Sequence, residues 1–185
     1  MADDRIDEVR TEDAEGTYAL GRALAGAATP LPADGLVVAL HGDLGAGKTL
    51  FVKGVAAGLG IGGDAQVVSP TFTIARSYPA PGGVVLHHLD AYRLGGGEEL
   101  EGIGFEDMRG PGRLTCVEWA ERVADALPED RIDLWLELHP GPEGDDRSIE
   151  PGSAPELPRR IRLRAGGLTS QRILGRLGAM RRSVP

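Results

Sequence analysis

The sequence predicts a three-layer α/β protein, in which helices cover both faces of a mostly parallel central sheet and an antiparallel hairpin lies near the C-terminus. Apolar runs at residues 36–40, 84–89 and 114–117 have the length and composition of strands buried in a parallel sheet. Apolar residues at helical spacing follow the first run, so strand and helix alternate. The chain has 185 residues, enough for one well-buried core, and we expect a single domain.

The remaining elements follow from local patterns. Residues 1–10 are charged and poor in large apolar groups, which predicts a flexible start. A helix is expected from Asp13 to Ala27, where the apolar spacing is helical, and the prolines at 30 and 32 end it. The other expected elements are strands over 67–78, 84–90, 114–119, 131–139 and 160–164, short helical turns within 98–108, and a last helix capped by Thr169 that runs to Ala179. The Pro- and Gly-rich residues 140–158 predict a mobile loop between the two strands of the hairpin.

Residues 42–49 read GDLGAGKT, which matches the phosphate-binding pattern G-x-x-x-x-G-K-[ST] in full. The motif lies between a predicted strand and a predicted helix, as a phosphate-binding loop requires. Its glycines permit positive φ, so that successive backbone N–H groups can point at a phosphate, and the start of the next helix adds positive potential. Lys48 would reach the terminal phosphates, and the hydroxyl of Thr49 suits Mg²⁺. Nucleotide binding is therefore the first functional prediction.

Two predicted strands carry a carboxylate near their carboxyl ends, Asp90 in one and Glu118 in the other. Ligands of α/β sheets bind at that edge, so both residues are candidates to hold Mg²⁺ or its water. The residues alone leave open which of the two contacts the metal. The adjacent His87 and His88 are expected to point to opposite faces of their strand.

The segment Ser69-Pro70-Thr71 is a polar turn at the start of a predicted strand. Its hydroxyls could sense a γ-phosphate and Mg²⁺, as switch segments do. An ordinary strand entrance would contain the same residue types, so both interpretations stay open.

The composition argues against a membrane-spanning, a secreted or a disulfide-rich protein. No apolar run approaches the length that crosses a bilayer, and the acidic N-terminus MADDRIDEVR does not resemble a secretory signal. Cys116 is the only cysteine, which excludes a disulfide framework and a cysteine-based metal site. We therefore expect a cytoplasmic protein.

The charge is unevenly distributed along the chain. The formal net charge is −8, yet residues 159–185 contain eight arginines and no Asp or Glu. This arginine-rich segment would be either the solvated face of a strand and a helix or a surface for an acidic protein or RNA.

Four motifs together resemble one family closely. In order and spacing, GDLGAGKT at 42–49, SPTFT at 69–73, LDAYRL at 89–94 and VEW at 117–119 are similar to motifs of the bacterial TsaE family. The resemblance covers the chain from Thr17 to Leu138, and the 140–158 loop has the character of an insertion. It implies a small P-loop ATPase that uses ATP with Mg²⁺ and is required for making threonylcarbamoyladenosine in tRNA. It also implies a TsaD–TsaB partner complex, in which TsaD performs the transfer and ATP hydrolysis resets the complex between turnovers.

The resemblance assigns roles to single residues. It places the nucleotide on Gly42, Asp43, Leu44, Gly45, Ala46, Gly47, Lys48 and Thr49, with the adenine near Ala14. Thr49 and Glu118 match metal positions, and Asp90 matches a Walker-B-like aspartate. Thr71 matches a switch-like threonine, and Trp119 matches an aromatic residue that follows the acidic one. The catalytic candidates are Lys48, Asp90, Glu118 and Thr71. No arginine finger can be assigned, and one supplied by the partner would make the isolated protein a slow ATPase.

Two other classes of P-loop protein compete with this interpretation. A small-molecule kinase would need an acceptor pocket and an arginine-bearing lid, yet the dense arginine cluster at 159–164 has the pattern of a strand. A GTP-driven switch would resemble its class in an Asn-Lys-x-Asp motif, and this chain contains no asparagine. The ATPase interpretation is therefore preferred.

Overall fold

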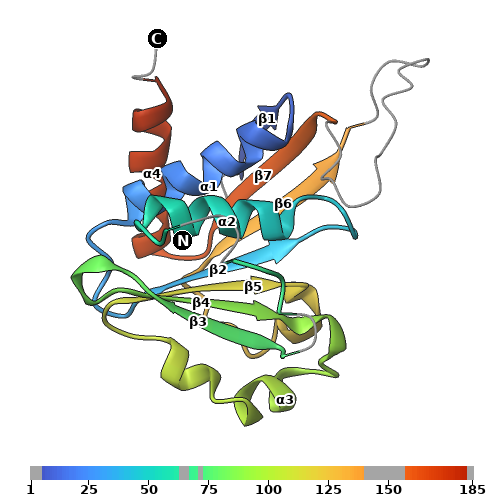
Figure 1. Ribbon diagram of the computed structural model, residues 1–185, viewed down its shortest axis with the longest axis vertical. Helices are drawn as coiled ribbons and strands as arrows, with labels where there is room; N and C mark the ends of the chain where they lie inside the picture. The colour runs from blue at the N-terminus through green and yellow to red at the C-terminus, as the bar shows by residue number, and fades with distance from the viewer. Residues whose placement is uncertain (1–5, 63–66, 71–72, 140–156, 183–185) are drawn as a thin grey trace.

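The computed structural model describes residues 6–62, 67–70, 73–139 and 157–182. Its centre is a seven-stranded sheet with the strand order β1-β7-β6-β2-β5-β4-β3 (Figure 1). The strands are β1 (Ile6–Thr11), β2 (Leu36–His41), β3 (Ala75–Pro79), β4 (Val85–Asp90), β5 (Arg113–Glu118), β6 (Ile132–Leu138) and β7 (Arg159–Ala165). The α-helices are α1 (Ala14–Ala28), α2 (Lys48–Gly58), α3 (Gly97–Gly102) and α4 (Leu168–Arg182), and short 3₁₀ helices span Pro81–Gly83, Ala91–Arg93, Phe105–Met108 and Ala120–Val123.

The strand directions confirm the α/β class and refine the predicted topology. The four central strands β6, β2, β5 and β4 run parallel to one another. The three outer pairings, β3 with β4, β7 with β6 and β1 with β7, are antiparallel. The prediction of a mostly parallel sheet therefore holds for the centre alone, whereas the predicted antiparallel hairpin is present as β6 and β7.

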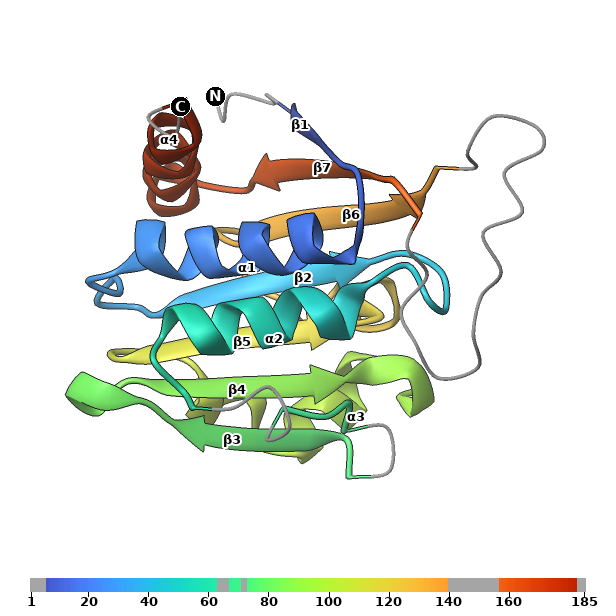
Figure 2. The same ribbon diagram turned by 45° about the horizontal axis from the view of Figure 1, so that its top comes forward.

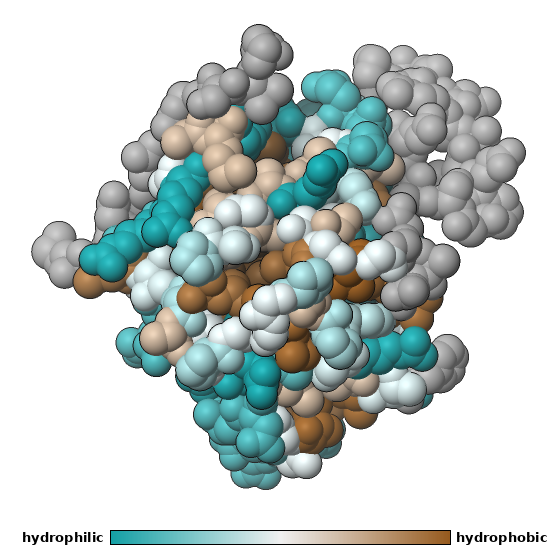
Figure 3. Space-filling view, turned by 60° about the vertical axis from the view of Figure 1, so that its left-hand side comes forward, coloured by the Kyte–Doolittle hydropathy of each residue, from teal (hydrophilic) through white to brown (hydrophobic). Residues whose placement is uncertain are grey.

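Helices lie on both faces of the sheet. Helices α1 and α2 lie side by side over one face and α3 lies on the other (Figure 2). The larger apolar core, which includes Leu24, Phe51 and Ile132, lies under α1 and α2. A smaller cluster with Leu100, Phe105 and Val117 fills the opposite face. On the side of the molecule shown in Figure 3, apolar residues are interspersed with polar ones. No helix among the described residues is long and apolar enough to cross a membrane.

Glycines bring α1 and α2 into close contact. A Cβ atom at Gly54 would lie 2.0 Å from the carbonyl oxygen of Tyr18, and one at Gly21 would lie 2.2 Å from that of Phe51. Neither position has room for a side chain. The backbones of the two helices therefore approach directly, and this contact fixes the helix that begins at Lys48.

The N-terminal prediction was wrong for residues 6–10, which belong to strand β1 rather than to a flexible start. Strand β1 pairs with β7, and the side chains of Val9 and Thr11 on β1 are buried. On the other face, Glu8 accepts hydrogen bonds from Arg160. The charged residues that suggested disorder thus find partners about 150 residues away. Residues 1–5 and the loop at 140–156 lie outside the described residues.

The strand expected over 67–78 is also shorter in the structure. Residues 67–70 form no strand, and the backbone N–H groups of Thr73 and Ile74 donate to the carbonyl of Pro70. Ile74 has a left-handed φ of 65°. This turn delays the start of the strand to Ala75.

The sequence predicts that Thr169 caps the last helix, and this prediction was wrong. The backbone N–H groups of Thr169 and Ser170 donate to the carboxylate of Asp130, at 2.9 and 3.0 Å. These hydrogen bonds lower the pKa of Asp130 against the opposing effect of its partial burial. A residue from the turn before β6 therefore caps α4 across the fold.

Candidate functional site

The predicted phosphate-binding loop, residues 42–49 (hereafter the phosphate loop), connects β2 to α2 as expected. Gly42, Gly45 and Gly47 have φ values of 134°, 81° and 109°. A Cβ atom at Gly42 would lie 2.3 Å from the carbonyl oxygen of Leu136 on β6. Both this close contact and the positive φ therefore exclude a side chain at Gly42. At Gly45 the space is open and the positive φ alone favours glycine.

The start of α2 is suited to an anion. Its N-cap residue, Gly47, provides no side-chain hydrogen bond, and the first turn contains no acidic residue. The first backbone N–H groups of an α-helix have no acceptor within the helix, and the helix dipole makes this end positive. Leu44, at the tip of the loop, is 88% exposed. The tip of the phosphate loop is therefore open to solvent.

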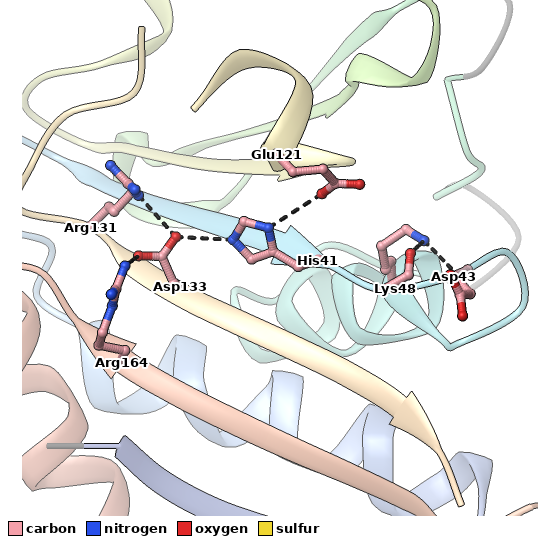
Figure 4. A network of polar contacts seen from close by, with 8 residues as sticks. His41, Asp43, Lys48, Glu121, Arg131, Asp133 and Arg164 are labelled. Carbon is pink, nitrogen blue, oxygen red and sulfur yellow. Dashed lines mark hydrogen bonds and ion pairs between the residues drawn. The ribbon is translucent and has the colours of Figure 1, made fainter. Parts of the chain in front are cut away.

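Lys48 is buried and lies across the phosphate loop. Its Nζ donates to the carbonyls of Gly42 and Asp43, at 2.5 and 2.9 Å (Figure 4). The same ammonium lies 3.9 Å from the centre of the Trp119 ring. Burial lowers the pKa of Lys48, and the negative charges of nearby carboxylates, Glu118 first among them, oppose that shift. The lysine is thus held by weak carbonyl acceptors that phosphate oxygens could replace.

Thr49 identifies which carboxylate faces the loop. Its hydroxyl donates to Oε1 of Glu118 at 2.8 Å. The same oxygen lies 2.7 Å from Nε2 of His88, which is fully buried on the neighbouring strand. A carboxylate that accepts the hydrogen of a hydroxyl turns the lone pairs of that hydroxyl outward. Glu118 therefore orients Thr49, and His88 holds Glu118.

Asp90 lies beside Glu118 at the predicted edge of the sheet, because the two residues are register partners on β4 and β5. Its carboxylate accepts a hydrogen bond from the hydroxyl of Ser69 at 3.1 Å and one from the backbone N–H of Tyr92 at 3.0 Å. Asp90 thus fixes the turn after β4 and one side chain of the segment before β3.

The donor set fits magnesium held largely by a nucleotide. Among the described residues, no three His, Cys, Asp or Glu side chains are grouped so that they could hold a metal ion by themselves. Protein-bound Mg²⁺ usually keeps several waters and takes one or two protein ligands together with phosphate oxygens. Thr49, Glu118 and Asp90, at the mouth of the phosphate loop, match that requirement.

Comparison with known proteins assigns the family. The model of the family described as threonylcarbamoyl adenosine biosynthesis protein TsaE matches residues 11–148. The chain belongs to the TsaE family. It is 43% identical over 129 residues to the tRNA threonylcarbamoyladenosine biosynthesis protein TsaE of Streptomyces coelicolor, which covers 69% of this chain and 82% of that protein. It is 41% identical over 125 residues to the protein of the same name from Bacillus subtilis, with 68% and 73% covered.

A solved structure has a similar fold. The crystal structure of Bacillus subtilis YdiB superimposes with a TM-score of 0.67 and 29% sequence identity, over 96% of this chain and 97% of that one. The similarity in fold therefore extends over nearly the whole chain, well beyond the four motifs.

The roles that the TsaE resemblance assigned to single residues all remain predictions, including those of Thr71 and Ala14. Thr71 lies outside the described residues. Ala14 is the first residue of α1, one turn before Thr17. A Cβ atom at Gly47 would lie 3.6 Å from Cγ2 of Thr17, so the start of α1 does approach the phosphate loop. An adenine contact at Ala14 is consistent with this placement.

A cavity of about 450 Å³ lies between the phosphate loop and the end of β6. Its lining consists of loop residues and the end of β6, namely Gly42, Asp43, Ala46, Trp135, Leu136, Glu137 and Leu138. This volume lies within the range of small-molecule sites. The candidate site therefore has space beside the loop that is predicted to bind phosphate.

Three residues of the site were not predicted from the sequence. The sequence predicts only the direction of His88 in its strand, although its position two residues before Asp90 places it on the same face as Asp90. No motif points to His41, although it directly precedes Gly42. Arg159 is 1% exposed, and its Nε donates to the carbonyl of Ala46 at 3.1 Å. Only the pairing of β7 with β6, on the side of the phosphate loop, reveals that role for Arg159.

The arginine-rich segment is largely paired where the structure describes it. Arg160 binds Glu8, Arg162 binds Glu137 at 2.5 Å, and Arg164 binds Asp133 at 3.0 Å. These ion pairs support the interpretation of β7 as a solvated strand face rather than as a free basic surface.

Proposed function

We propose that this protein is a Mg²⁺-dependent ATPase that acts in the formation of threonylcarbamoyladenosine in tRNA, as a subunit working with a TsaD–TsaB complex and not as the transferase. The observation that carries the proposal is the hydrogen bond from Thr49 to Glu118 beside Lys48, at the uncapped start of α2. This arrangement has a purpose only if a polyphosphate and a cation are bound together. The TsaE relatives are named for tRNA threonylcarbamoyladenosine biosynthesis, and this supplies the pathway.

The residues would divide the work of ATP hydrolysis. The backbone N–H groups of the phosphate loop and the Nζ of Lys48 would bind and neutralise the phosphates. Thr49, oriented by Glu118, would take part in holding Mg²⁺, with Asp90 beside them. When bound, Mg²⁺ supplies positive charge that stabilises the transferred phosphoryl group. The carboxylates of Asp90 and Glu118 are the described groups available to orient an attacking water.

The partner complex would complete the site. In P-loop enzymes an arginine beside the transferred phosphoryl group accelerates hydrolysis by about 10³–10⁵-fold, and a partner protein often supplies it. The nearest arginine of this chain described at the loop, Arg159, is engaged by the carbonyls of Ala46 and Leu157. We therefore expect slow hydrolysis by the isolated protein and faster hydrolysis with the partner.

The test is the rate of ATP hydrolysis by the purified protein, alone and with a TsaD–TsaB complex, for the wild type and for Lys48→Ala. We expect slow turnover alone, stimulation by the complex and loss of both rates in the variant. The matched control is Lys53→Ala, which removes the only other lysine, in the middle of α2, and should keep both rates. A complex that neither binds the protein nor changes its rate would contradict the proposal.

A further inference from the structure

A second polar network lies at the base of the phosphate loop and is not used by the proposed mechanism. His41, the last residue of β2, directly precedes Gly42. Its imidazole lies between two carboxylates, with Nε2 at 3.0 Å from Asp133 and Nδ1 at 3.3 Å from Glu121. Figure 4 shows this chain of contacts beside Lys48.

Asp133 is held as an anion. It is 2% exposed and lies on β6. Burial would raise its pKa, but hydrogen bonds from His41, Arg164 and Arg131 together hold the pKa well below its usual range. An ionised carboxylate only accepts hydrogen bonds, so Nε2 of His41 must carry a hydrogen.

Glu121 places a second requirement on the same ring. Its side chain is 48% exposed, and its carboxylate oxygen accepts hydrogen bonds. A hydrogen bond from His41 to Glu121 therefore requires a hydrogen on Nδ1 as well. Only the imidazolium form carries both hydrogens, and in the neutral ring a lone pair of Nδ1 would face the carboxylate.

Glu121 is connected to the phosphate site by the chain itself. It lies in the 3₁₀ helix Ala120–Val123, which begins directly after Trp119. Trp119 has a left-handed φ of 57°, and its ring contacts the ammonium of Lys48. The charge of Glu121 also acts on Lys48, since it opposes the lowering of the lysine's pKa. Holding Glu121 therefore fixes the turn that carries Glu118 and Trp119 and sets the distance of one negative charge from Lys48.

We propose that His41 is a positioning residue for the nucleotide site, which in its imidazolium form ties Glu121 and the Trp119 turn to the base of the phosphate loop. The other charged groups that face this ring are Asp133 from β6, backed by Arg131 from the preceding turn and Arg164 from β7. The imidazole ring stacks on the ring of Trp135, with 5.0 Å between the two ring centres, and this stacking restrains the orientation of the imidazole. This inference rests on the proposed nucleotide binding.

The consequence is an energetic coupling between His41 and Glu121 in nucleotide binding. Loss of either side chain removes the same contact, so the Trp119 turn is released and the affinity for the nucleotide falls. The second loss then has no further contact to remove, so the effects of the two substitutions should not add.

The experiment measures binding of a fluorescent N-methylanthraniloyl-ATP with Mg²⁺ by the full chain, for the wild type, His41→Phe, Glu121→Ala and the double variant. Phenylalanine can keep the stack on Trp135 but has no hydrogen bond to donate. Each single variant should bind about three- to tenfold more weakly than the wild type, and the double variant should bind no more weakly than the weaker single variant. His139→Gln removes an exposed imidazole and should bind the probe as the wild type does.

The outcomes separate the two proposals. Losses that add in the double variant would overturn the role of His41. Wild-type protein that fails to bind the probe, or Lys48→Ala that binds it as tightly, would overturn the nucleotide site itself. Glu121 is half exposed, so its variant is expected to fold, and Glu121→Ala that binds the probe as tightly as the wild type would overturn the role of His41 even if His41→Phe is unstable.

Discussion

The hydroxyl of Thr49 lies 2.8 Å from Oε1 of Glu118, and this contact joins the first turn of α2 to the end of β5. Strand β2, which leads into the phosphate loop, pairs directly with β5, and Leu40 and Glu118 are register partners. Asp90 is one strand further away, on β4. Sheet order therefore decides which of two similar carboxylates meets the threonine.

We expect Glu118→Gln to lower the affinity for Mg²⁺, so that nucleotide binding requires a higher Mg²⁺ concentration, while the protein stays folded. The amide oxygen can still accept from Thr49, but the charge that would attract the cation is lost. Loss of a group around a metal typically reduces metal affinity or activity by about 10–100-fold. Fluorescent nucleotide binding titrated with Mg²⁺ measures this, and Glu106→Gln, an exposed glutamate paired with Arg109, is the control. An unchanged Mg²⁺ requirement would rule out this role for Glu118.

His88 offers a test of how Glu118 is held. Because Nε2 makes the hydrogen bond, glutamine can place an amide N–H near the same point, whereas the shorter asparagine cannot. We expect His88→Gln to unfold in urea within about 1 kcal/mol of the wild type and His88→Asn to lose about 1–3 kcal/mol more. Equal losses for the two variants would show that the ring packs there without a specific hydrogen bond.

The network around Asp133 should make stability depend on acid pH. Its folded-state pKa is depressed, so it contributes stability that is complete above the unfolded pKa, about 3.9, and is lost as pH falls through the folded value. Asp133→Asn should therefore cost about 3 kcal/mol at pH 7, and this difference should shrink below about pH 4. Urea unfolding at several pH values measures it, with the exposed Asp34→Asn as control. A difference that is constant or grows toward low pH would contradict the interpretation.

The centre of the fold was predictable because its signals are local. The run 36–40 is apolar on both faces, the glycine pattern of 42–49 is contiguous, and parallel strands end at one edge of the sheet. The predictions of strands, loop and paired carboxylates therefore agree with the structure, apart from the strand at 67–78, where residues 67–70 form no strand and β3 begins at Ala75.

The predictions that were wrong concern partners far apart in the chain. The sequence predicts a flexible segment at residues 6–10 because their charges have no local partner, yet Glu8 pairs with Arg160 on β7. Thr169 is locally a good cap, but Asp130 reaches the helix first. His41 and His88 were not predicted as site residues because their partners, Glu121, Asp133 and Glu118, are 30 or more residues away. Such contacts depend on strand order and register, which no local pattern contains.

The close contact of α1 with α2 gives a prediction in which one substitution has opposite effects at two sites. Alanine is a better helix former than glycine by about 1 kcal/mol. At Gly175 of α4, where no atom would lie within 4 Å of a Cβ, Gly175→Ala should stabilise the protein by about 0.5–1 kcal/mol. At Gly54 the Cβ would lie 2.0 Å from the carbonyl oxygen of Tyr18, so Gly54→Ala must push the helices apart and should cost about 2–4 kcal/mol.

The same displacement should reach the nucleotide site. Gly54 lies in the middle of α2, six residues after Lys48, so a shift of that helix moves Lys48 and Thr49 away from Glu118. Gly54→Ala should then bind the fluorescent nucleotide more weakly at temperatures where it is fully folded, while Gly175→Ala binds it as the wild type does. Urea unfolding and nucleotide titration on the two variants test both parts. If Gly54→Ala were as stable as Gly175→Ala, the two helices would not be held at the distance that the structure shows.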